Sequence, residues 1–382
     1  ARPGVVREVS TSSSELALRA AELLGVTIQK VRSTAPGSEK SKVVYEKTLE
    51  EIALNRMSPL KPVSEGDVES GALHVCPTRR FAIEQQSSSG TLKIRIIDDF
   101  AESFVNDLCA VDGHLCMGRI SEFVSTARLL TEHQPSEDLN VLKADFKSAY
   151  RHCPIRTDHL LYAVVILINC MSGEPSISTH FAMPFGALGA VYAWDRLGDA
   201  ICHIVSYFLI IPLSRYVDDM FSPVYAKHAS EIRALLIELS NLLGVILDPS
   251  KTPVPSAEET VLGVLIKIFR RFRRRLKRAS VTCILDPSRA EFWRQKILEI
   301  LSDRIFRPEV ARKMAGRLNF ASSAAVGGPG ASRLKEIYKS SFCVREFCSN
   351  LEQELVWWAG RLENPRPVSV PIGPRPDRVI VL

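Results

Sequence analysis

The chain has 382 residues, of which 46% are hydrophobic and 24% charged, and its net charge is +6. These values are typical of a globular protein and allow two or three domains. Nine cysteines without CxxC spacing argue against a disulfide framework or a zinc site, and indicate an intracellular protein of the cytoplasm or nucleus. The longest apolar runs are too short to span a bilayer, so no membrane association is expected. Because the sequence begins at Ala1, we expect a fragment or a processed product.

The first 75 residues predict an N-terminal helical extension. Residues 12–25 combine a capping serine with an apolar stripe, which predicts an amphipathic helix that ends at Gly25. Residues 33–42 predict a loop, and residues 43–57 return to a helical pattern.

Residues 79–85 and 92–98 predict the two strands of a hairpin, joined by a flexible tip rich in serine. Side chains alternate along a strand, so Lys93 and Arg95 share one face. That face is either a solvated surface or a contact for phosphate groups. We interpret the two aspartates at positions 98 and 99 as structural, closing the strand with hydrogen bonds at the surface.

The centre of the chain combines strands with long helices. Residues 141–150 predict a strand that ends at Asp145. A long Ala-rich helix is entered through the turn 184–186, and residues 229–243 predict an amphipathic helix that ends at Gly244. Short strands are predicted at 245–248 and 260–266.

From residue 287 onward the pattern predicts helices alone, the first two at 287–303 and 307–325. Residues 326–332 break the helical pattern. Residues 363–376 predict a Pro-rich linker, which leads into an apolar segment that resembles the first strand of a further domain.

The excess positive charge sits in one short segment. Residues 267–278 carry eight basic residues and no acidic one, and the rest of the chain sums to −2. Such a run is usually a solvated face or a localisation signal. Here apolar residues interrupt the charges, which favours a structured element laid against a phosphate backbone. The predicted nucleic-acid contacts are Arg270, Arg271, Arg273, Arg274, Arg275, Lys277 and Arg278.

Two adjacent aspartates, Asp218 and Asp219, stand between apolar runs. Adjacent carboxylates repel each other, so the pair marks either a surface turn or a metal site in which a cation removes the repulsion. Strand character on both sides predicts a hairpin bend at the pair. A strand end and a hairpin bend can lie side by side in one sheet, which would bring Asp145 to the same place. Three carboxylates suit Mg²⁺, and two such ions about 4 Å apart stabilise the attacking and leaving oxygens of a phosphoryl displacement.

The order of these motifs resembles the polymerase region of reverse transcriptases, over roughly residues 75–320. The segments that carry the likeness are, in family order, LKIRIIDDF, ADFKSAY, MPFGALGA, YVDD, LGVILDPSKT and VLGVLI. The resemblance implies an α+β right-hand polymerase fold, with fingers, a palm whose antiparallel sheet packs on helices, and a helical thumb. It divides the chain into an N-terminal extension (1–75), fingers and palm (76–265), a basic hairpin with the thumb (266–325), and a connection with a linker (326–382).

The family's roles are carried over residue by residue. Asp145, Asp218 and Asp219 would hold two Mg²⁺ ions, or Mn²⁺ in their place. Lys251 would give a proton to the leaving pyrophosphate, unless it is only a solvated loop lysine. The residues that the resemblance places at the incoming nucleotide are Lys93, Arg95, Phe146 (through its carbonyl), Tyr150, Phe185 and Gly186.

The ring of Tyr150 helps to choose between classes of polymerase. A bulky ring under the sugar would collide with a 2′-hydroxyl, the group that distinguishes RNA from DNA. The ring therefore favours deoxynucleotides over ribonucleotides, unless it is a core tyrosine at the start of a helix.

The resemblance implies template-directed DNA synthesis, with an RNA template, a DNA primer or template, and dNTPs as partners. Two alternatives stay open: an RNA-dependent RNA polymerase, and a non-catalytic palm that binds RNA as a scaffold. The presence of all three carboxylates argues for chemistry. The segments 312–325 and 351–367 resemble retroelements of the DIRS type, whereas GALGAVYAW departs from the Ala-Pro pair frequent in the family. No ribonuclease H activity is expected, because the chain ends before the carboxylates of such a domain.

Overall fold

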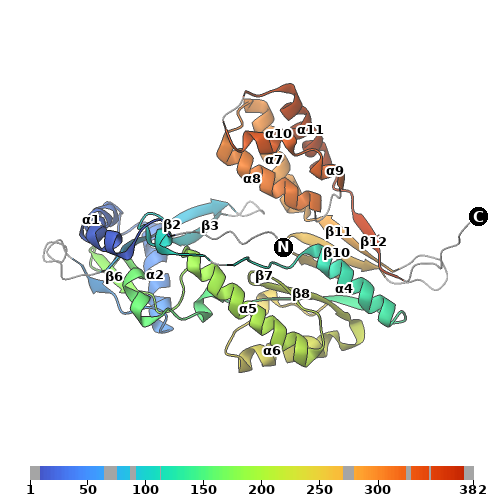
Figure 1. The fold of residues 1–382 in the computed structure, drawn as a ribbon, viewed down its shortest axis with the longest axis horizontal. Coiled ribbons are helices and arrows are strands. Elements are labelled where there is room, and N and C mark those ends of the chain that lie inside the picture. The colour runs from blue at the N-terminus through green and yellow to red at the C-terminus, as the bar shows by residue number, and fades with distance from the viewer. Residues whose placement is uncertain are drawn as a thin grey trace, which may run out of the picture. The chain divides into compact units, whose positions relative to one another are not determined.

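The computed structural model describes residues 9–63, 75–86, 92–111, 113–269, 279–323, 328–343 and 346–373. The chain divides into two compact units (Figure 1). The first contains residues up to 86, 92–116 and 148–200, and the second contains 117–147 and 201–373. Each unit is assembled from segments that are far apart in the sequence. Among the described residues, no helix has the length and apolar character needed to cross a membrane.

The first unit is built on a five-stranded sheet of order β1-β6-β5-β2-β3. Its strands are β1 (Lys61–Pro62), β2 (Pro77–Gln86), β3 (Leu92–Asp98), β5 (Val164–Ile168) and β6 (Pro175–Thr179). Neighbouring strands are antiparallel except for β2 and β5, which are parallel. The β2–β3 pair confirms the predicted hairpin strands. Its register places Lys93 opposite Gln85 and Arg95 opposite Ile83.

Helix α1 (Ser13–Arg32) packs on this sheet and is longer than its sequence pattern suggests. Ser12 caps it, accepting a hydrogen bond from the N–H of Glu15 at 3.2 Å. The prediction that the helix ends at Gly25 is wrong. A glycine inside a helix costs about 1 kcal/mol, whereas each apolar side chain buried beyond it contributes about 1.5–3 kcal/mol. The apolar core that stabilises the longer helix consists of Leu24, Ile28, Val31, Val63, Ile166 and Ile168.

Helix α2 (Glu39–Ala53) begins inside the predicted loop. Ser38 provides the N-cap by accepting a hydrogen bond from the N–H of Ser41 at 3.2 Å, a signal that the loop-like composition of residues 33–42 concealed. Helix α5 (Leu188–Leu209) confirms the long helix predicted after the turn 184–186. It starts in the first unit and continues into the second.

The second unit contains a three-stranded sheet of order β4-β8-β7. Its strands are β4 (Leu139–Asp145), β7 (Ser214–Tyr216) and β8 (Asp219–Tyr225). Helix α4 (Ile120–His133) packs against it through Phe123, in a core that also holds Phe221 of β8. Helix α6 (Ala229–Leu242) confirms the predicted amphipathic helix, and Gly244 follows its end with a φ of 74°.

A four-stranded sheet of order β12-β11-β10-β9 completes the strands of this unit. Its strands are β9 (Glu258–Val261), β10 (Val264–Phe269), β11 (Ser280–Leu285) and β12 (Val368–Pro371). The single strand predicted at 260–266 is instead a hairpin, because Leu262 and Gly263 have φ angles of 53° and 79° and reverse the chain. The predicted strand at 245–248 forms only an isolated bridge, between Leu247 and Phe146.

The predicted Pro-rich linker contributes β12 to this sheet, so the expectation of helices alone after residue 287 is wrong. β12 pairs with β11, with Val370 opposite Val281. Without β12, the edge of β11 would expose unpaired backbone N–H and C=O groups. β12, which follows α11, forms hydrogen bonds with these groups. The apolar segment 377–382 and all of the basic residues from Arg270 to Arg278 lie outside the described residues.

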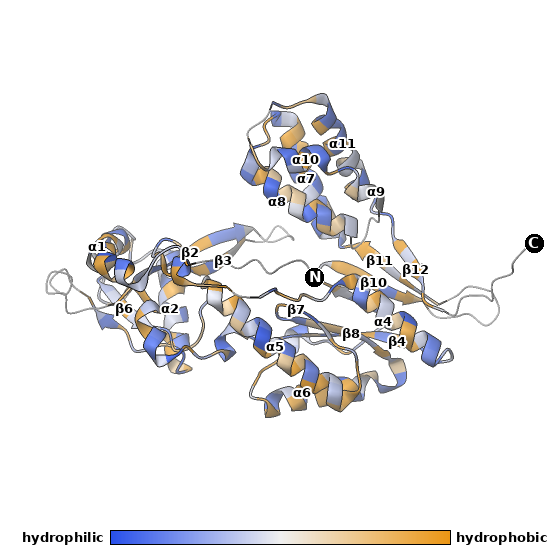
Figure 2. Cartoon of the chain, viewed as in Figure 1, coloured by the Kyte–Doolittle hydropathy of each residue, from blue (hydrophilic) through white to orange (hydrophobic). Residues whose placement is uncertain are grey.

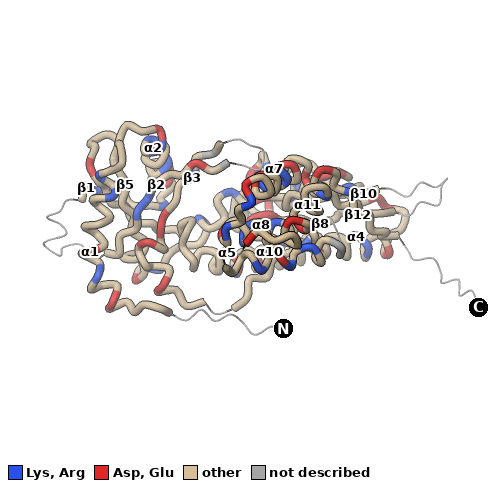
Figure 3. Tube along the Cα trace, turned by 90° about the horizontal axis from the view of Figure 1, so that it is seen from above, with Lys and Arg blue, Asp and Glu red and all other residues tan. Residues whose placement is uncertain are grey.

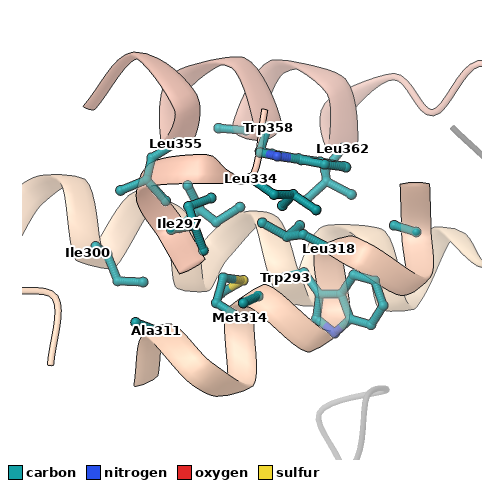
Figure 4. Packing of buried hydrophobic residues seen from close by; sticks show 14 of the residues in the cluster. Trp293, Ile297, Ile300, Ala311, Met314, Leu318, Leu334, Leu355, Trp358 and Leu362 are labelled. Carbon is teal, nitrogen blue, oxygen red and sulfur yellow. The ribbon is translucent and has the colours of Figure 1, made fainter. Parts of the chain in front are cut away.

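A helical bundle follows β11 and leads back to β12 (Figure 1). Its helices are α7 (Pro287–Asp303), α8 (Pro308–Ala321), α9 (Gly328–Ala331), α10 (Lys335–Ser340) and α11 (Ser349–Glu363). Trp293, Met314, Leu318 and Trp358 form part of its apolar core (Figure 4). Both α7 and α8 carry bands of hydrophobic and hydrophilic residues (Figure 2), as expected of helices that bury one face. The predicted break at 326–332 contains the short helix α9.

Candidate active site

Three carboxylates meet where β4 ends and the β7–β8 hairpin turns. Asp145 is the last residue of β4, and it pairs with Asp219, the first residue of β8. Asp218 lies in the two-residue turn, at the predicted hairpin bend. Ligand oxygens of all three side chains lie within 4.8 Å of one another. The structure thus brings together the three aspartates that the sequence singled out.

The turn that carries Asp218 has a strained backbone. Val217 has a φ of 54°, at a turn position where glycine is usual, and a β-branched residue rarely adopts this conformation. Its carbonyl accepts a hydrogen bond from Nη1 of Arg215 at 2.9 Å, and its N–H donates to the sulfur of Met117 at 3.4 Å. Strain of this kind costs of order 1–3 kcal/mol and persists only where the surroundings hold it. These contacts therefore fix the backbone that presents Asp218.

The chain after α6 holds Asp145 from its other side. The N–H of Asp248 donates to the carbonyl of Asp145 at 2.8 Å. Asp248 then caps the short 3-10 helix Pro249–Lys251 by accepting a hydrogen bond from the N–H of Ser250 at 3.0 Å. As a result Nζ of Lys251 lies 2.8 Å from Oδ2 of Asp145.

The charges of the site are unbalanced. Burial raises the pKa of Asp218, and the Asp145 carboxylate adds to the effect. Burial, followed by the charges of Asp218 and Asp145, raises the pKa of Asp219 to about 6. The hydrogen bond to Asp145 raises the pKa of Lys251, so this ammonium keeps its proton. Lys143 and Lys251 both act on Asp219, so among the described residues three carboxylates still outnumber the lysines that act on them.

The donor set fits Mg²⁺ or Mn²⁺. It offers only hard carboxylate oxygens, without the thiol or imidazole ligands that select zinc. Asp145 is 4% exposed, and Asp218 and Asp219 are half-buried, so one side of the group stays accessible. Burial and, after it, the neighbouring carboxylates raise the pKa values of Asp218 and Asp219, and a divalent cation would offset both effects.

Three of the residues assigned to the nucleotide lie together in the first unit. The rings of Tyr150 and Phe185 have centroids 4.9 Å apart. Gly186 has a φ of 101°, and a Cβ at this position would lie 2.4 Å from the carbonyl oxygen of Asp98. Only glycine fits there. Nδ2 of Asn106 donates to the Gly186 carbonyl at 3.0 Å, and its Oδ1 accepts from the first N–H of α5 at 2.8 Å.

The other predicted nucleotide residues are less closely defined. Phe146 is 1% exposed, so its ring belongs to the core, and its N–H donates to the carbonyl of Asp218 at 3.1 Å. Arg95 is exposed on β3, and the side chain of Lys93 lies outside the described part of the chain. Their contact with the triphosphate stays a prediction.

Asp98 ends β3, as predicted, but the expectation of surface hydrogen bonds is wrong for this residue. It is 5% exposed, and both of its oxygens accept hydrogen bonds from Nη1 of Arg80 at 2.8 Å. Arg80 stands directly opposite Asp98 in the β2–β3 register, and this pairing permits the burial of both charges. Asp99 is half-buried and accepts a hydrogen bond from the N–H of Glu102 at 2.9 Å.

A cavity of about 750 Å³ borders Asp218 and Asp219, and its walls include cations that sequence reasoning missed. Arg317 of α8 is half-buried beside the ring of Phe292, and burial lowers its pKa. Arg289 of α7 donates to the carbonyl of Leu262 in the β9–β10 turn at 2.9 Å. The helical pattern alone could not identify these residues, because tertiary packing decides which helix face borders the carboxylates. Basic and acidic residues are interspersed along α7, α8 and α10 (Figure 3).

Neither the protein-family models nor the curated proteins provide a match to this chain. Among solved structures it resembles a foamy viral protease-reverse transcriptase in complex with double-stranded DNA, with a TM-score of 0.55 and 13% sequence identity. The match covers 95% of this chain, which spans 62% of that protein. The fold is therefore a mixed α+β fold of the reverse-transcriptase type, with antiparallel sheets packed on helices, as predicted. The likeness to DIRS-type elements stays a prediction.

Proposed function

We propose that the chain synthesises DNA on an RNA template, and also on a DNA template, by adding nucleotides from dNTPs to the 3′-hydroxyl of a primer. The observation that carries this proposal is the position of Asp145, Asp218 and Asp219 at one strand end and its adjoining hairpin turn, within a reverse-transcriptase-type fold. The structural neighbour was determined with double-stranded DNA, which supports nucleic-acid binding by this fold.

In this proposal the β4-β8-β7 sheet with α4 and α6 is the palm. The β2–β3 hairpin belongs to the fingers and presents Lys93 and Arg95 to the triphosphate, where a guanidinium can bind two phosphate oxygens at once. The helices that follow β11 form the thumb and the connection. The basic run 270–278 and Arg317 contact the phosphate backbone without reading sequence.

The reaction joins the primer O3′ to the α-phosphorus of the dNTP, while the bond from that phosphorus to the bridging oxygen breaks and pyrophosphate leaves. Two divalent cations held by the three aspartates would lower the pKa of the 3′-hydroxyl and neutralise charge on the leaving group. Lys251 keeps its proton through its contact with Asp145 and can donate it to the pyrophosphate. The Tyr150 ring, packed against Phe185, excludes a 2′-hydroxyl.

Primer extension on an RNA template with Mg²⁺ tests this proposal, comparing dNTPs with NTPs. Asp218→Asn removes one metal ligand and should lower the rate about a thousandfold, equivalent to about 4 kcal/mol of transition-state stabilisation. Asp303→Asn is the matched control, because this exposed residue ends α7 and lies outside the carboxylate group. It should extend primers at the wild-type rate.

The other outcomes separate the alternatives. Extension with NTPs would assign the protein to the RNA-dependent RNA polymerases. Tight binding of primer–template without extension would favour a non-catalytic scaffold. Equal rates for Asp218→Asn and the control would remove the carboxylate site from the mechanism.

A further inference from the structure

A buried network of charged residues lies in the first unit, which also contains the candidate nucleotide residues Tyr150, Phe185 and Gly186. Asp98 receives two hydrogen bonds of 2.8 Å from Arg80. Nε2 of His180 lies 3.2 Å from Oδ2 of the same carboxylate. Arg80, Asp98 and His180 are all less than 9% exposed. Nε of Arg80 also donates to the hydroxyl of Thr48 in α2 at 3.0 Å, so the network reaches the N-terminal helices.

Arg151 extends this network toward the surface. Its Nη1 lies 3.1 Å from Nδ1 of His180 and donates to the carbonyl of Ala182 at 2.8 Å. Its Nε and Nη2 donate to Oε2 of Glu51 in α2, at 2.9 Å and 2.6 Å. Arg151 is 7% exposed, and Glu51 is the one carboxylate bonded to it among the described contacts. Loss of the Glu51 charge would leave a buried cation without its counter-ion.

The network contacts the segments that carry three of the candidate nucleotide residues, Tyr150, Phe185 and Gly186. Arg151 directly follows Tyr150 in the 3-10 helix Ala149–His152. The Ala182 carbonyl, which Arg151 binds, lies in the segment that leads to Phe185 and Gly186. The backbone of Asp98 also approaches Gly186 closely, since a Cβ there would lie 2.4 Å from the Asp98 carbonyl oxygen. A shift of Arg151 would therefore move the Tyr150 ring relative to Phe185.

We propose that Glu51 and Arg151 are positioning residues for sugar selection, through which the N-terminal helix α2 sets the place of the Tyr150 ring. This inference rests on the proposed polymerase function. It extends that function by making α2 part of the nucleotide site, although α2 belongs to a segment predicted to be only an extension. The position of a ring decides whether a 2′-hydroxyl fits, so an error of a fraction of an ångström at Tyr150 would admit ribonucleotides.

A purely structural role is the competing explanation. Buried ion pairs are weak contributors to stability, and apolar residues of similar volume often replace them without loss. What such residues cannot replace is the directed set of hydrogen bonds from one guanidinium to Glu51, His180 and Ala182. The two roles therefore differ in what a substitution changes: stability alone, or the choice of sugar.

The test compares Glu51→Gln with Glu50→Gln in the full chain. Glu50 is the matched control, since it is the preceding residue of α2, is 60% exposed and pairs only with Lys47 among the described ion pairs. Three quantities are measured: KM for dNTPs, the ratio of kcat/KM for dNTPs to that for NTPs, and the Kd for primer–template. For Glu51→Gln we expect KM for dNTPs to rise about tenfold and the dNTP-to-NTP ratio of kcat/KM to fall about tenfold. These changes are smaller than the rate loss of about a hundredfold that a misplacement of 1 Å can cause. The Kd should not change, and Glu51→Asp should restore part of the ratio.

A second variant keeps the proposal open to refutation if Glu51→Gln does not fold. Glu51→Gln combined with Arg151→Met removes both charges of the pair. Arg56, the other cation near Glu51 at 3.8 Å, is 20% exposed to water, so the variant should fold and also lose sugar discrimination. Wild-type discrimination in either folded Glu51 variant would overturn the inference while leaving the polymerase function intact. A wild type that extends no primer would instead overturn the proposed function, and this inference with it.

Discussion

Asp145 and Asp219 stand opposite each other across the β4–β8 ladder, one ending its strand and the other beginning its own. Directly opposite like charges destabilise a sheet. Asp218 adds a third carboxylate to the same place, and its pKa and that of Asp219 are both raised. The ionised carboxylates therefore destabilise the metal-free protein, as expected of a group that could hold a cation.

The raised pKa of Asp219 predicts how stability depends on pH in the absence of metal. A folded-state pKa of about 6, above the unfolded value, means that the contribution of Asp219 to stability is present at low pH and is lost as the pH rises through about 6. Asp219→Asn should therefore stabilise the metal-free protein at pH 8, by about 1 kcal/mol in this partly solvated site. Thermal unfolding at pH 5 and pH 8 measures the difference.

The same variant should lose its response to Mg²⁺. A cation that binds only the folded state raises the melting temperature of the wild type, and more so at pH 8, where protons no longer compete for the carboxylates. Asp303→Asn should respond like the wild type. If Mg²⁺ shifted the melting temperature of Asp219→Asn by the wild-type amount, Asp219 would not be a ligand.

Local signals predicted the elements that surround the carboxylates. The strand that ends at Asp145, the hairpin bend at Asp218 and the helix that ends before Gly244 all follow from patterning and turn residues. The meeting of Asp145 with Asp218 and Asp219 could also be predicted, because a strand end and a hairpin bend in one sheet can be arranged in few ways.

Long-range packing explains what local signals missed. The low helix propensity of Gly25 predicts the end of a helix there. Burial of the apolar residues that follow it extends α1 to Arg32. Asp98 resembles a surface strand end until Arg80 is placed opposite it across the hairpin. Arg317 borders the cavity because of how α8 packs, and the hydrophobic periodicity of the sequence does not reveal this packing.

Replacing Val217 tests the strain in the carboxylate turn. Val217→Gly relieves a conformation that costs about 1–3 kcal/mol but adds about 0.5–1 kcal/mol of unfolded-state freedom, so we expect a net gain of up to about 2 kcal/mol. Polymerase activity should fall several-fold, since the looser turn no longer fixes Asp218. Urea unfolding and primer extension measure the two effects. Val224→Gly in the same hairpin should instead destabilise, because Val224 is 1% exposed and unstrained. Destabilisation by both variants would refute strain at Val217.

Arg317 should contribute to binding of the nucleic-acid backbone. A half-buried guanidinium that borders the cavity beside Asp218 and Asp219 has no acidic partner among the described ion pairs, so a phosphate would supply its missing counter-charge. Arg317→Ala should weaken primer–template binding by about 1 kcal/mol, roughly fivefold, and lower the salt slope by about one. Lys313→Ala, an exposed residue one turn earlier in α8, should have a smaller effect. An unchanged salt slope for Arg317→Ala would exclude the contact.

The Asp98 ion pair predicts a stability effect that the neighbouring aspartate should not share. Although burial opposes it, Arg80 and His180 hold the pKa of Asp98 below its usual range. A lowered folded-state pKa gives a contribution that is present above the unfolded value of about 4 and is lost as the pH falls below it. Asp98→Asn leaves Arg80 buried without its counter-ion and should cost about 3–5 kcal/mol at pH 7. Asp99→Asn removes one acceptor of a backbone N–H and should cost about 1 kcal/mol. Urea unfolding at pH 7 and pH 4 compares the two variants, and equal losses at pH 7 would mean that the buried pair does not hold the hairpin.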